Sequence, residues 1–300
     1  MKMKMTWHGV IPAMTTAFKP DLSVDHAAVA KHARWLVANG CHGIVALGSL
    51  GESATLTLPE KREILKTCVE ALNGKPVVAG IASSSTADAV ELARSAARAG
   101  CAGLMVLPPY VYSSDWREMK AHLDLVLRAT TLSCMLYNNP VAYQTDFLPE
   151  QIRELAATHS NLHAVKESSA DVRRVTAIKA LCRDRLALFV GVDDLIVEGI
   201  RAGAVGWIAG LANALPRESV ALFHRALRGD RMKTDQLYRW FLPLLRFDTG
   251  VKFVQLIKLV QQSVGRGHER VRPPRLVLGG TERKAALQVI RDSLASRPRL

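Results

Sequence analysis

The stretch ARAGCAGL at residues 97–104 decides the fold, because it ends an amphipathic helical pattern and passes directly into an apolar run. The same arrangement recurs as ANGCHGI at 38–44 and as IRAGAVGW at 200–207. Glycine ends helices readily, since it adopts a left-handed backbone at no steric cost. A strand that follows at once predicts a chain built from repeated strand–helix units.

Eight apolar runs of this kind are found before residue 210. They are short, rich in Val, Ile and Leu, and continuous rather than alternating, which is typical of parallel strands covered on both faces. The runs are Val10–Thr16, Gly43–Gly48, Pro76–Ile81, Gly103–Pro108, Ser133–Tyr137, Leu162–Val165, Leu186–Val192 and Ala204–Ala209.

Helical patterns separate most of these runs. They are Asp25–Asn39, Leu58–Leu72, Thr86–Ala99 with Thr86 as its N-cap, Asp115–Ala129, Pro149–Ala157 and Asp171–Leu181. Eight strand–helix units predict an α/β fold, a (β/α)8 TIM barrel. No GxGxxG follows the first run, which argues against a doubly wound sheet.

The strand pattern stops after residue 216, and only helical patterns follow. These are Glu218–Arg228, Thr234–Leu245, Val251–Val264 and Glu282–Leu294. The first completes the barrel. We therefore expect a catalytic barrel over 1–228 and a C-terminal helical extension over 229–300 that packs on it.

The chain of 300 residues carries 40 Lys+Arg against 27 Asp+Glu, a net charge of +13. Residues 217–300 hold 18 of the basic and 7 of the acidic residues, so the surplus belongs to the C-terminal quarter of the chain. These basic residues are spread over amphipathic helices rather than clustered with aromatic residues, so no nucleic-acid partner is expected. We interpret the surplus as the surface of the extension.

Other classes are excluded by simple patterns. No window approaches ~18 consecutive apolar residues, and Met1–Trp7 lacks the apolar core of a signal peptide, so we expect neither membrane insertion nor export. The five cysteines are scattered with no CxxC pair, which fits a reducing cytoplasm.

The candidate catalytic residues follow from the barrel, whose active site lies at the carboxyl ends of the strands. Lys166 closes the sixth run, where burial would leave a neutral amine able to attack a carbonyl and form a Schiff base. Tyr137 closes the fifth run and could shuttle protons, and Ser49 lies between glycines whose N–H groups could hold a carboxylate. From these residues alone, a lysine paired with Glu167, a packing tyrosine and a turn serine remain open alternatives.

Three motifs together carry a resemblance: Gly-Ser-x-Gly-Glu at 48–52, Tyr-Asn-x-Pro at 137–140 and Val-Lys-Glu-Ser at 165–168. This set resembles the dihydrodipicolinate synthase / N-acetylneuraminate lyase family over about residues 7–300, the extension included. The resemblance implies a homotetramer of TIM barrels that acts on 2-oxo acids through a lysine Schiff base, with no metal and no other cofactor.

Residue by residue, the resemblance makes Lys166 the Schiff-base lysine and Tyr137 the proton relay. Ser49 would stand beside the substrate carboxylate and link Tyr137 to Tyr110, a tyrosine that reaches in from an adjacent subunit. The predicted substrate-binding residues are Gly48, Leu50, Ala142, Tyr143, Asp193 and Ile208.

Departures from the family pattern bear on the substrate. Ala142 stands where family synthases have an arginine that holds a second carboxylate, and an apolar wall of Leu50, Tyr143 and Trp207 favours a compact substrate with few charges. The leading hypothesis is a dehydratase or deaminase such as 1-pyrroline-4-hydroxy-2-carboxylate deaminase, with Asp193 or Asp194 binding the substrate hydroxyl. The alternatives are 4-hydroxy-tetrahydrodipicolinate synthase, a 2-keto-3-deoxy sugar acid aldolase or dehydratase, a catalytically dead barrel and, from another class, a nucleic-acid-binding protein.

Overall fold

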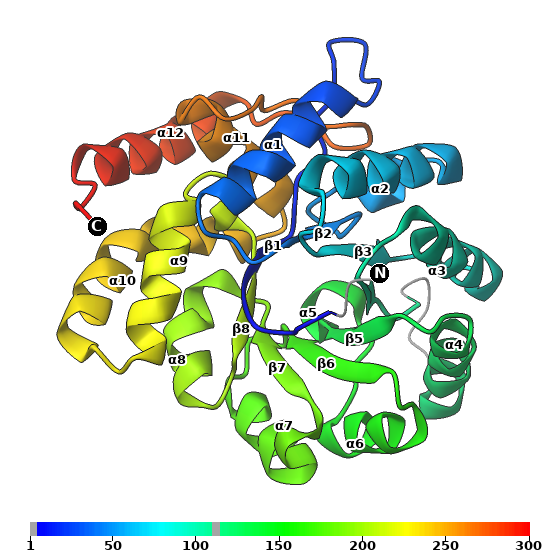
Figure 1. Ribbon diagram of the computed structural model, residues 1–300. Helices are drawn as coiled ribbons and strands as arrows, with labels where there is room; N and C mark the ends of the chain where they lie inside the picture. Colours follow the sequence, from blue (N-terminus) through cyan, green and yellow to red (C-terminus); the bar gives the residue numbers. More distant parts are fainter. Residues whose placement is uncertain (1–4, 110–114) are drawn as a thin grey trace.

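The computed structural model describes residues 5–109 and 115–300 of the chain. Its centre is a ring of parallel strands with helices around it (Figure 1). The strands are β1 (Gly9–Pro12), β2 (Ile44–Ala46), β3 (Val77–Ile81), β4 (Gly103–Val106), β5 (Ser133–Asn138), β6 (Leu162–Glu167), β7 (Ala187–Val190) and β8 (Gly206–Ala209). Each falls within or overlaps one predicted run, so the predicted TIM barrel is confirmed.

The ring closes at the two ends of the strand order. β1 pairs with β8, with Ile11 opposite Ile208, and the bridge between Ala13 and Val45 joins β1 to β2. Nearly every strand residue is buried, because the barrel interior covers one face of the sheet and the helices cover the other.

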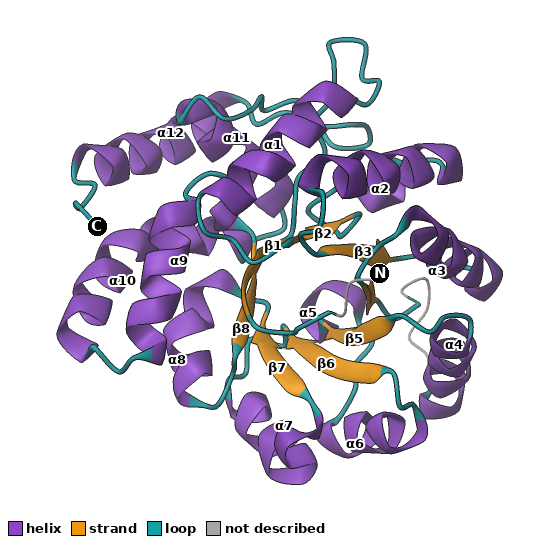
Figure 2. Ribbon diagram, in the orientation of Figure 1, coloured by secondary structure: helices purple, strands orange, loops and turns teal. Residues whose placement is uncertain are grey.

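The helices form the outer layer, purple in Figure 2. They are α1 (His26–Ala38), α2 (Leu58–Leu72), α3 (Thr86–Ala99), α4 (Trp116–Arg128), α5 (Pro140–Tyr143), α6 (Pro149–Thr158), α7 (Arg173–Cys182), α8 (Ile196–Arg201), α9 (Pro216–Leu227), α10 (Arg231–Leu245), α11 (Phe253–Ser263) and α12 (Gly280–Ala295). The sequence analysis did not predict α5 and α8, because each is too short to show a helical period.

Side chains that satisfy free backbone N–H groups set where the helices begin. Asp25 accepts a hydrogen bond from the Ala28 N–H at the start of α1, and Thr57 forms a capping box with Glu60 at the start of α2. The cap of α3 is Ser85 rather than Thr86, since Ser85 has the extended backbone and accepts from the Asp88 N–H. Gly100 ends α3 with a φ of 89°, as the ARAGCAGL stretch predicts.

The C-terminal helices α10, α11 and α12 pack beside one another and against the barrel (Figure 1). One buried ion pair joins them to the loop after β2. Lys258 Nζ on α11 lies 2.5 Å from Glu52 Oε1, and both side chains are almost completely buried. Lys258 also donates to the Arg270 carbonyl, and Glu52 accepts from the Arg272 N–H, so the loop after α11 is held at the same point.

Replacing Lys258 with methionine should destabilise the protein strongly, because it leaves the Glu52 carboxylate buried without a counter-charge. We expect the free energy of unfolding to fall by about 3–5 kcal/mol in a chemical denaturation experiment. The double variant Glu52→Leu/Lys258→Met should recover most of that loss.

The matched control is Lys252→Met, which removes a lysine of the same helical region whose ion pair with Glu282 is half exposed. Its effect should stay within about 1 kcal/mol. Equal losses for Lys252→Met and Lys258→Met would show that burial of the pair does not matter.

Candidate active site

A cavity of about 420 Å³ opens at the carboxyl ends of the strands. Loops that follow the strands form one part of its wall, and the C-terminal extension forms another. The cavity brings together these sequence-predicted residues: Gly48, Ser49, Leu50, Tyr137, Ala142, Tyr143, Lys166 and Ile208. Tyr110, predicted as a relay from an adjacent subunit, lies outside the described residues.

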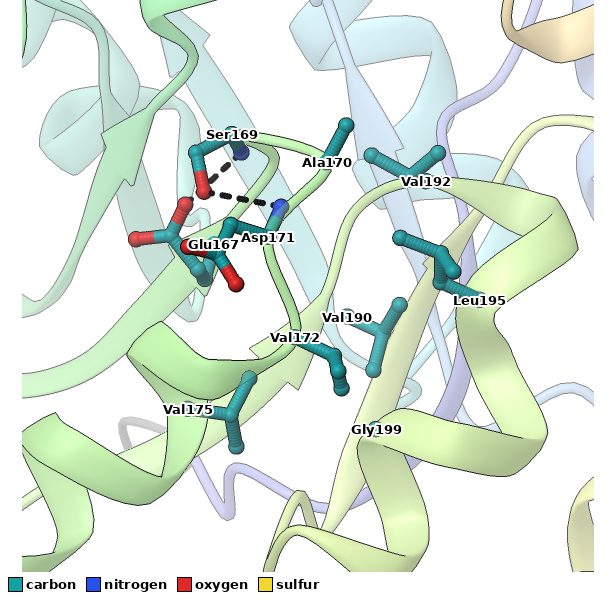
Figure 3. Close-up of a pocket in the computed structure, with 10 residues that line it drawn as sticks. All are labelled: Glu167, Ser169, Ala170, Asp171, Val172, Val175, Val190, Val192, Leu195 and Gly199. Atoms are coloured by element: carbon teal, nitrogen blue, oxygen red, sulfur yellow. Dashed lines mark hydrogen bonds between the residues drawn. The ribbon is translucent and has the colours of Figure 1, made fainter.

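Lys166 reaches the cavity because of its place in β6. Neighbouring strand residues point to opposite sides, so Lys166 faces the barrel mouth while Glu167 faces outward. Glu167 lines a small hollow together with Val175 of α7 and Val190 of β7 (Figure 3). Glu167 accepts hydrogen bonds from Asn138 and from the Ser169 N–H, so the predicted alternative of a Lys166–Glu167 pair is wrong.

The missing side chain of Gly191 makes room for Lys166. A Cβ at Gly191 would come within 2.4 Å of Lys166 Cε and 1.9 Å of Ser168 Oγ. Lys166 Nζ lies 3.7 Å from the centre of the Tyr137 ring, on the neighbouring strand, where the two residues are in register. In the described part of the chain, the amine makes no ion pair and no hydrogen bond.

The surroundings of Lys166 favour the neutral amine. Burial lowers the pKa of Lys166 to about 8, although the Asp248 and Asp193 carboxylates pull it upward. A lysine with its usual pKa is almost fully protonated near neutral pH, so this shift increases the nucleophilic form many-fold.

Tyr137 is placed to hold and release a proton. Burial raises the pKa of Tyr137 to about 12, and the phenol oxygen accepts a hydrogen bond of 2.9 Å from Asn139 Nδ2. The phenol therefore stays protonated at neutral pH, and its phenolate is a strong base when formed. The buried Ser168 hydroxyl is close enough to Tyr137 to lower its pKa, but no described group lies within hydrogen-bonding distance and angle of it.

Ser49 lies close enough to Tyr137 to lower its pKa, and it also contacts a tyrosine that was not predicted for the proton wire. Its hydroxyl is hydrogen-bonded to the phenol of Tyr143, which lies in the short helix α5 after β5. The Tyr143 ring meets the Tyr137 ring edge to face, with 5.9 Å between centroids. Ser49, Tyr143 and Tyr137 thus form one contiguous group on the cavity wall.

The structure gives Asp193 a place that differs from the prediction. It does not line the cavity; its fully buried carboxylate accepts hydrogen bonds from the Trp207 indole N–H and from the Gly210 and Leu211 N–H groups. These bonds use both oxygens, so Asp193 fixes the turn after β8 instead of facing a substrate. Trp207 is likewise buried beneath the wall, and Asp194 lies outside the cavity near Arg246.

The extension supplies wall residues that the sequence analysis missed. They are Asp248, Thr249, Gly250, Val251, Phe253 and Arg275. No strand precedes them, so a search limited to strand ends could not find them. Arg275 also shows that part of the basic surplus faces the cavity, whereas the sequence analysis assigned it to the surface.

Fold and site together define a (β/α)8-barrel enzyme with a buried lysine at the mouth of the barrel. The chain matches the sequence model of the Dihydrodipicolinate synthetase family over residues 6–292. It therefore belongs to that family of lyases, as the three motifs indicated.

Individual relatives agree with this assignment. The chain is 33% identical over 267 residues to a 4-hydroxy-tetrahydrodipicolinate synthase of Agrobacterium fabrum, covering 89% of this chain and 91% of the relative. It is 34% identical over 239 residues to the enzyme of the same name from a Chelativorans species, covering 79% and 82%. A dihydrodipicolinate synthase structure from Bacillus anthracis superposes with a TM-score of 0.92 at 26% identity, covering 98% of this chain and all of that one.

Among residues 5–109 and 115–300, no three His, Cys, Asp or Glu side chains are grouped so as to hold a metal ion. In the same ranges, every helix is too short or too polar to cross a membrane.

The lowered pKa of Lys166 predicts how adduct formation depends on pH. The rate at which a 2-oxo acid such as pyruvate forms a borohydride-reducible adduct should rise as pH passes about 8, because the neutral amine is the nucleophile. Initial rates are measured by quenching the reaction with borohydride and determining the mass of the intact protein by mass spectrometry. A rising limb centred near the usual lysine value, about 10.4, would contradict the assigned effect of burial.

Proposed function

We propose that the chain is a lysine Schiff-base lyase in which Lys166 condenses with the ketone carbon of a 2-oxo acid. The single observation that carries this proposal is the placement of Lys166, a buried amine without an ion pair that faces the cavity beside Tyr137. Burying an unpaired amine is costly unless it works in the neutral form. Family membership supports the same chemistry.

In the proposed mechanism the Lys166 amine adds to the ketone carbon and forms a carbinolamine. The Tyr137 phenol gives its proton to the carbinolamine hydroxyl, which leaves as water, and a protonated imine remains. The Tyr137 phenolate then removes a proton from C3, which restores the phenol and leaves an enamine. The cationic imine is the electron sink for this step.

The enamine carbon C3 attacks the aldehyde carbon of a second substrate, which restores the protonated imine, and the new alkoxide takes up the proton of the Tyr137 phenol. Water then hydrolyses the imine, so that a 4-hydroxy-2-oxo acid leaves and the Lys166 amine is regenerated. The N–H groups around Ser49, between Gly48 and Leu50, would hold the 2-oxo acid carboxylate.

The relatives favour condensation as the specific reaction. Those with 33% and 34% identity are named 4-hydroxy-tetrahydrodipicolinate synthase, which was our alternative hypothesis, and none of the comparisons supports the deaminase that we placed first. Because residue 142 is alanine, the chain lacks the arginine that would hold a second carboxylate at this position. Arg275 would supply another, since it lines the cavity and forms no ion pair in the described part of the chain.

Assembly and location belong to the same proposal. We infer from the family resemblance that the chain forms a homotetramer and acts in the cytoplasm on small-molecule substrates, without a metal. Tyr110 would enter the site of an adjacent subunit in that assembly. Light scattering of the purified protein measures the oligomeric state directly.

Borohydride trapping with a panel of substrates tests the proposal. With pyruvate, we expect a reduced adduct on the peptide that contains Lys166, and turnover when aspartate semialdehyde is added. Lys166→Met should abolish both, while the control Lys252→Met, at an exposed ion pair, should keep both.

The panel also separates the two levels of the proposal. If the wild-type peptide carries no adduct, the Schiff-base mechanism is wrong. If the adduct forms but only 1-pyrroline-4-hydroxy-2-carboxylate is turned over, the mechanism stands and the condensation reaction is replaced by deamination.

Replacing Tyr137 with phenylalanine should lower kcat by ~10²–10⁴, because the proton carrier is lost while the ring that covers Lys166 remains. Steady-state kinetics and circular dichroism of the variant give the effect on kcat and confirm the fold. An unchanged kcat would remove Tyr137 from the proton transfers.

A further inference from the structure

Asp248 is a carboxyl group in the cavity that no sequence motif identifies. It ends a short 3-10 helix, η5 (Arg246–Asp248), which connects α10 to α11. It is partly buried and lines the same cavity as Lys166. It therefore enters the active site from the extension, not from a barrel strand.

The carboxylate of Asp248 rests on the bare backbone of Gly210, just after β8. A Cβ at Gly210 would come within 2.1 Å of Asp248 Oδ1 and 2.6 Å of its Cγ. The φ of Gly210 is −81°, which any residue can adopt, so the backbone conformation does not require glycine there. Glycine is needed at this position because any side chain would collide with the Asp248 carboxylate.

Asp248 lacks a partner in the described part of the chain, in contrast to the nearby Asp193. The two oxygens of Asp193 accept three N–H groups, including that of Gly210 itself. Arg246, on the same 3-10 helix as Asp248, pairs with Asp194 instead. Asp248 is partly buried and lines the cavity, so a ligand bound there can supply the hydrogen-bond partner that the described residues do not.

The charges around Asp248 are consistent with an uncharged or hydrogen-bonded carboxyl. Burial, and after it the Asp193 carboxylate, hold the pKa of Asp248 well above its usual range, although Lys166 pulls it down. Asp248 and Lys166 influence each other without forming an ion pair. Both side chains line the cavity, so one ligand can contact both of them.

We propose that Asp248 hydrogen-bonds the oxygen on C4 of the substrate chain while C2 is bound to Lys166, and so selects 4-hydroxy-2-oxo acids over unsubstituted 2-oxo acids. This inference rests on the proposed function, because the C4 oxygen is defined by the Schiff base at C2. Ionised Asp248 accepts from a hydroxyl, and neutral Asp248 donates to an aldehyde oxygen. One side chain thus binds both the aldehyde and the product that the condensation makes from it.

The test uses two ligands that differ in one hydroxyl, 2-oxopentanoate and 4-hydroxy-2-oxopentanoate. Isothermal titration calorimetry gives the ratio of their dissociation constants, and borohydride trapping gives the ratio of adduct yields. For the wild-type protein we expect the hydroxylated ligand to bind about tenfold more tightly, because the unsubstituted ligand leaves the Asp248 carboxyl without a hydrogen-bond partner.

Three variants assign the preference to Asp248. Asp248→Leu should bring the ratio near unity, and Asp248→Asn, which keeps one acceptor oxygen, should give an intermediate ratio. Asp235→Asn is the control, because it removes a carboxylate of the extension that pairs with the surface residues Arg201 and Arg231 and does not line the cavity. It should leave the wild-type ratio unchanged.

Two outcomes overturn the inference: a wild-type ratio near unity, or a ratio that Asp248→Leu leaves unchanged. If Asp248→Leu does not fold, an unchanged ratio in Asp248→Asn has the same meaning. If neither ligand forms an adduct but calorimetry shows a preference that depends on Asp248, the proposed Schiff-base function fails and the binding role of Asp248 stands.

Discussion

The buried ion pair between Glu52 and Lys258 is the contact on which the assembled site depends. Glu52 ends the loop that carries Ser49, and it adopts a left-handed backbone with a φ of 57°, which a non-glycine residue keeps only when its surroundings impose it. Lys258 imposes it from α11. The same pair therefore fixes the loop that would hold the substrate carboxylate and docks the extension that brings Asp248 and Arg275 to the cavity.

The fold could be predicted from the sequence because its physical signals are local. Strands buried on both faces are continuous apolar runs, and glycines such as Gly100 mark where helices end, so all eight strands were placed correctly. The short helices α5 and α8 escaped because one or two turns show no period. Ser85 and Thr86 are both good caps, and only the backbone conformation distinguishes them.

Only the site residues that follow strand ends could be predicted from the sequence. Lys166, Tyr137 and Ser49 meet in one cavity because parallel strands end at one rim. Asp193 also follows a strand, yet its carboxylate accepts hydrogen bonds from backbone N–H groups instead of facing the cavity. This orientation depends on the turn after β8, which the sequence around Asp193 does not reveal. Asp248 and Arg275 were missed because their position depends on how the extension docks, which is a long-range property of the chain.

The pairing of β1 with β8 has a consequence for how the chain acquires its structure. Ile11 lies opposite Ile208, so the edge of β1 that pairs with β8 stays unpaired until β8 has been synthesised and has docked. Contacts so distant in sequence slow folding, and an open apolar strand edge attracts other chains in the meantime. The yield of folded protein should therefore fall with the concentration of refolding chains, and an excised amino-terminal half would be prone to aggregate.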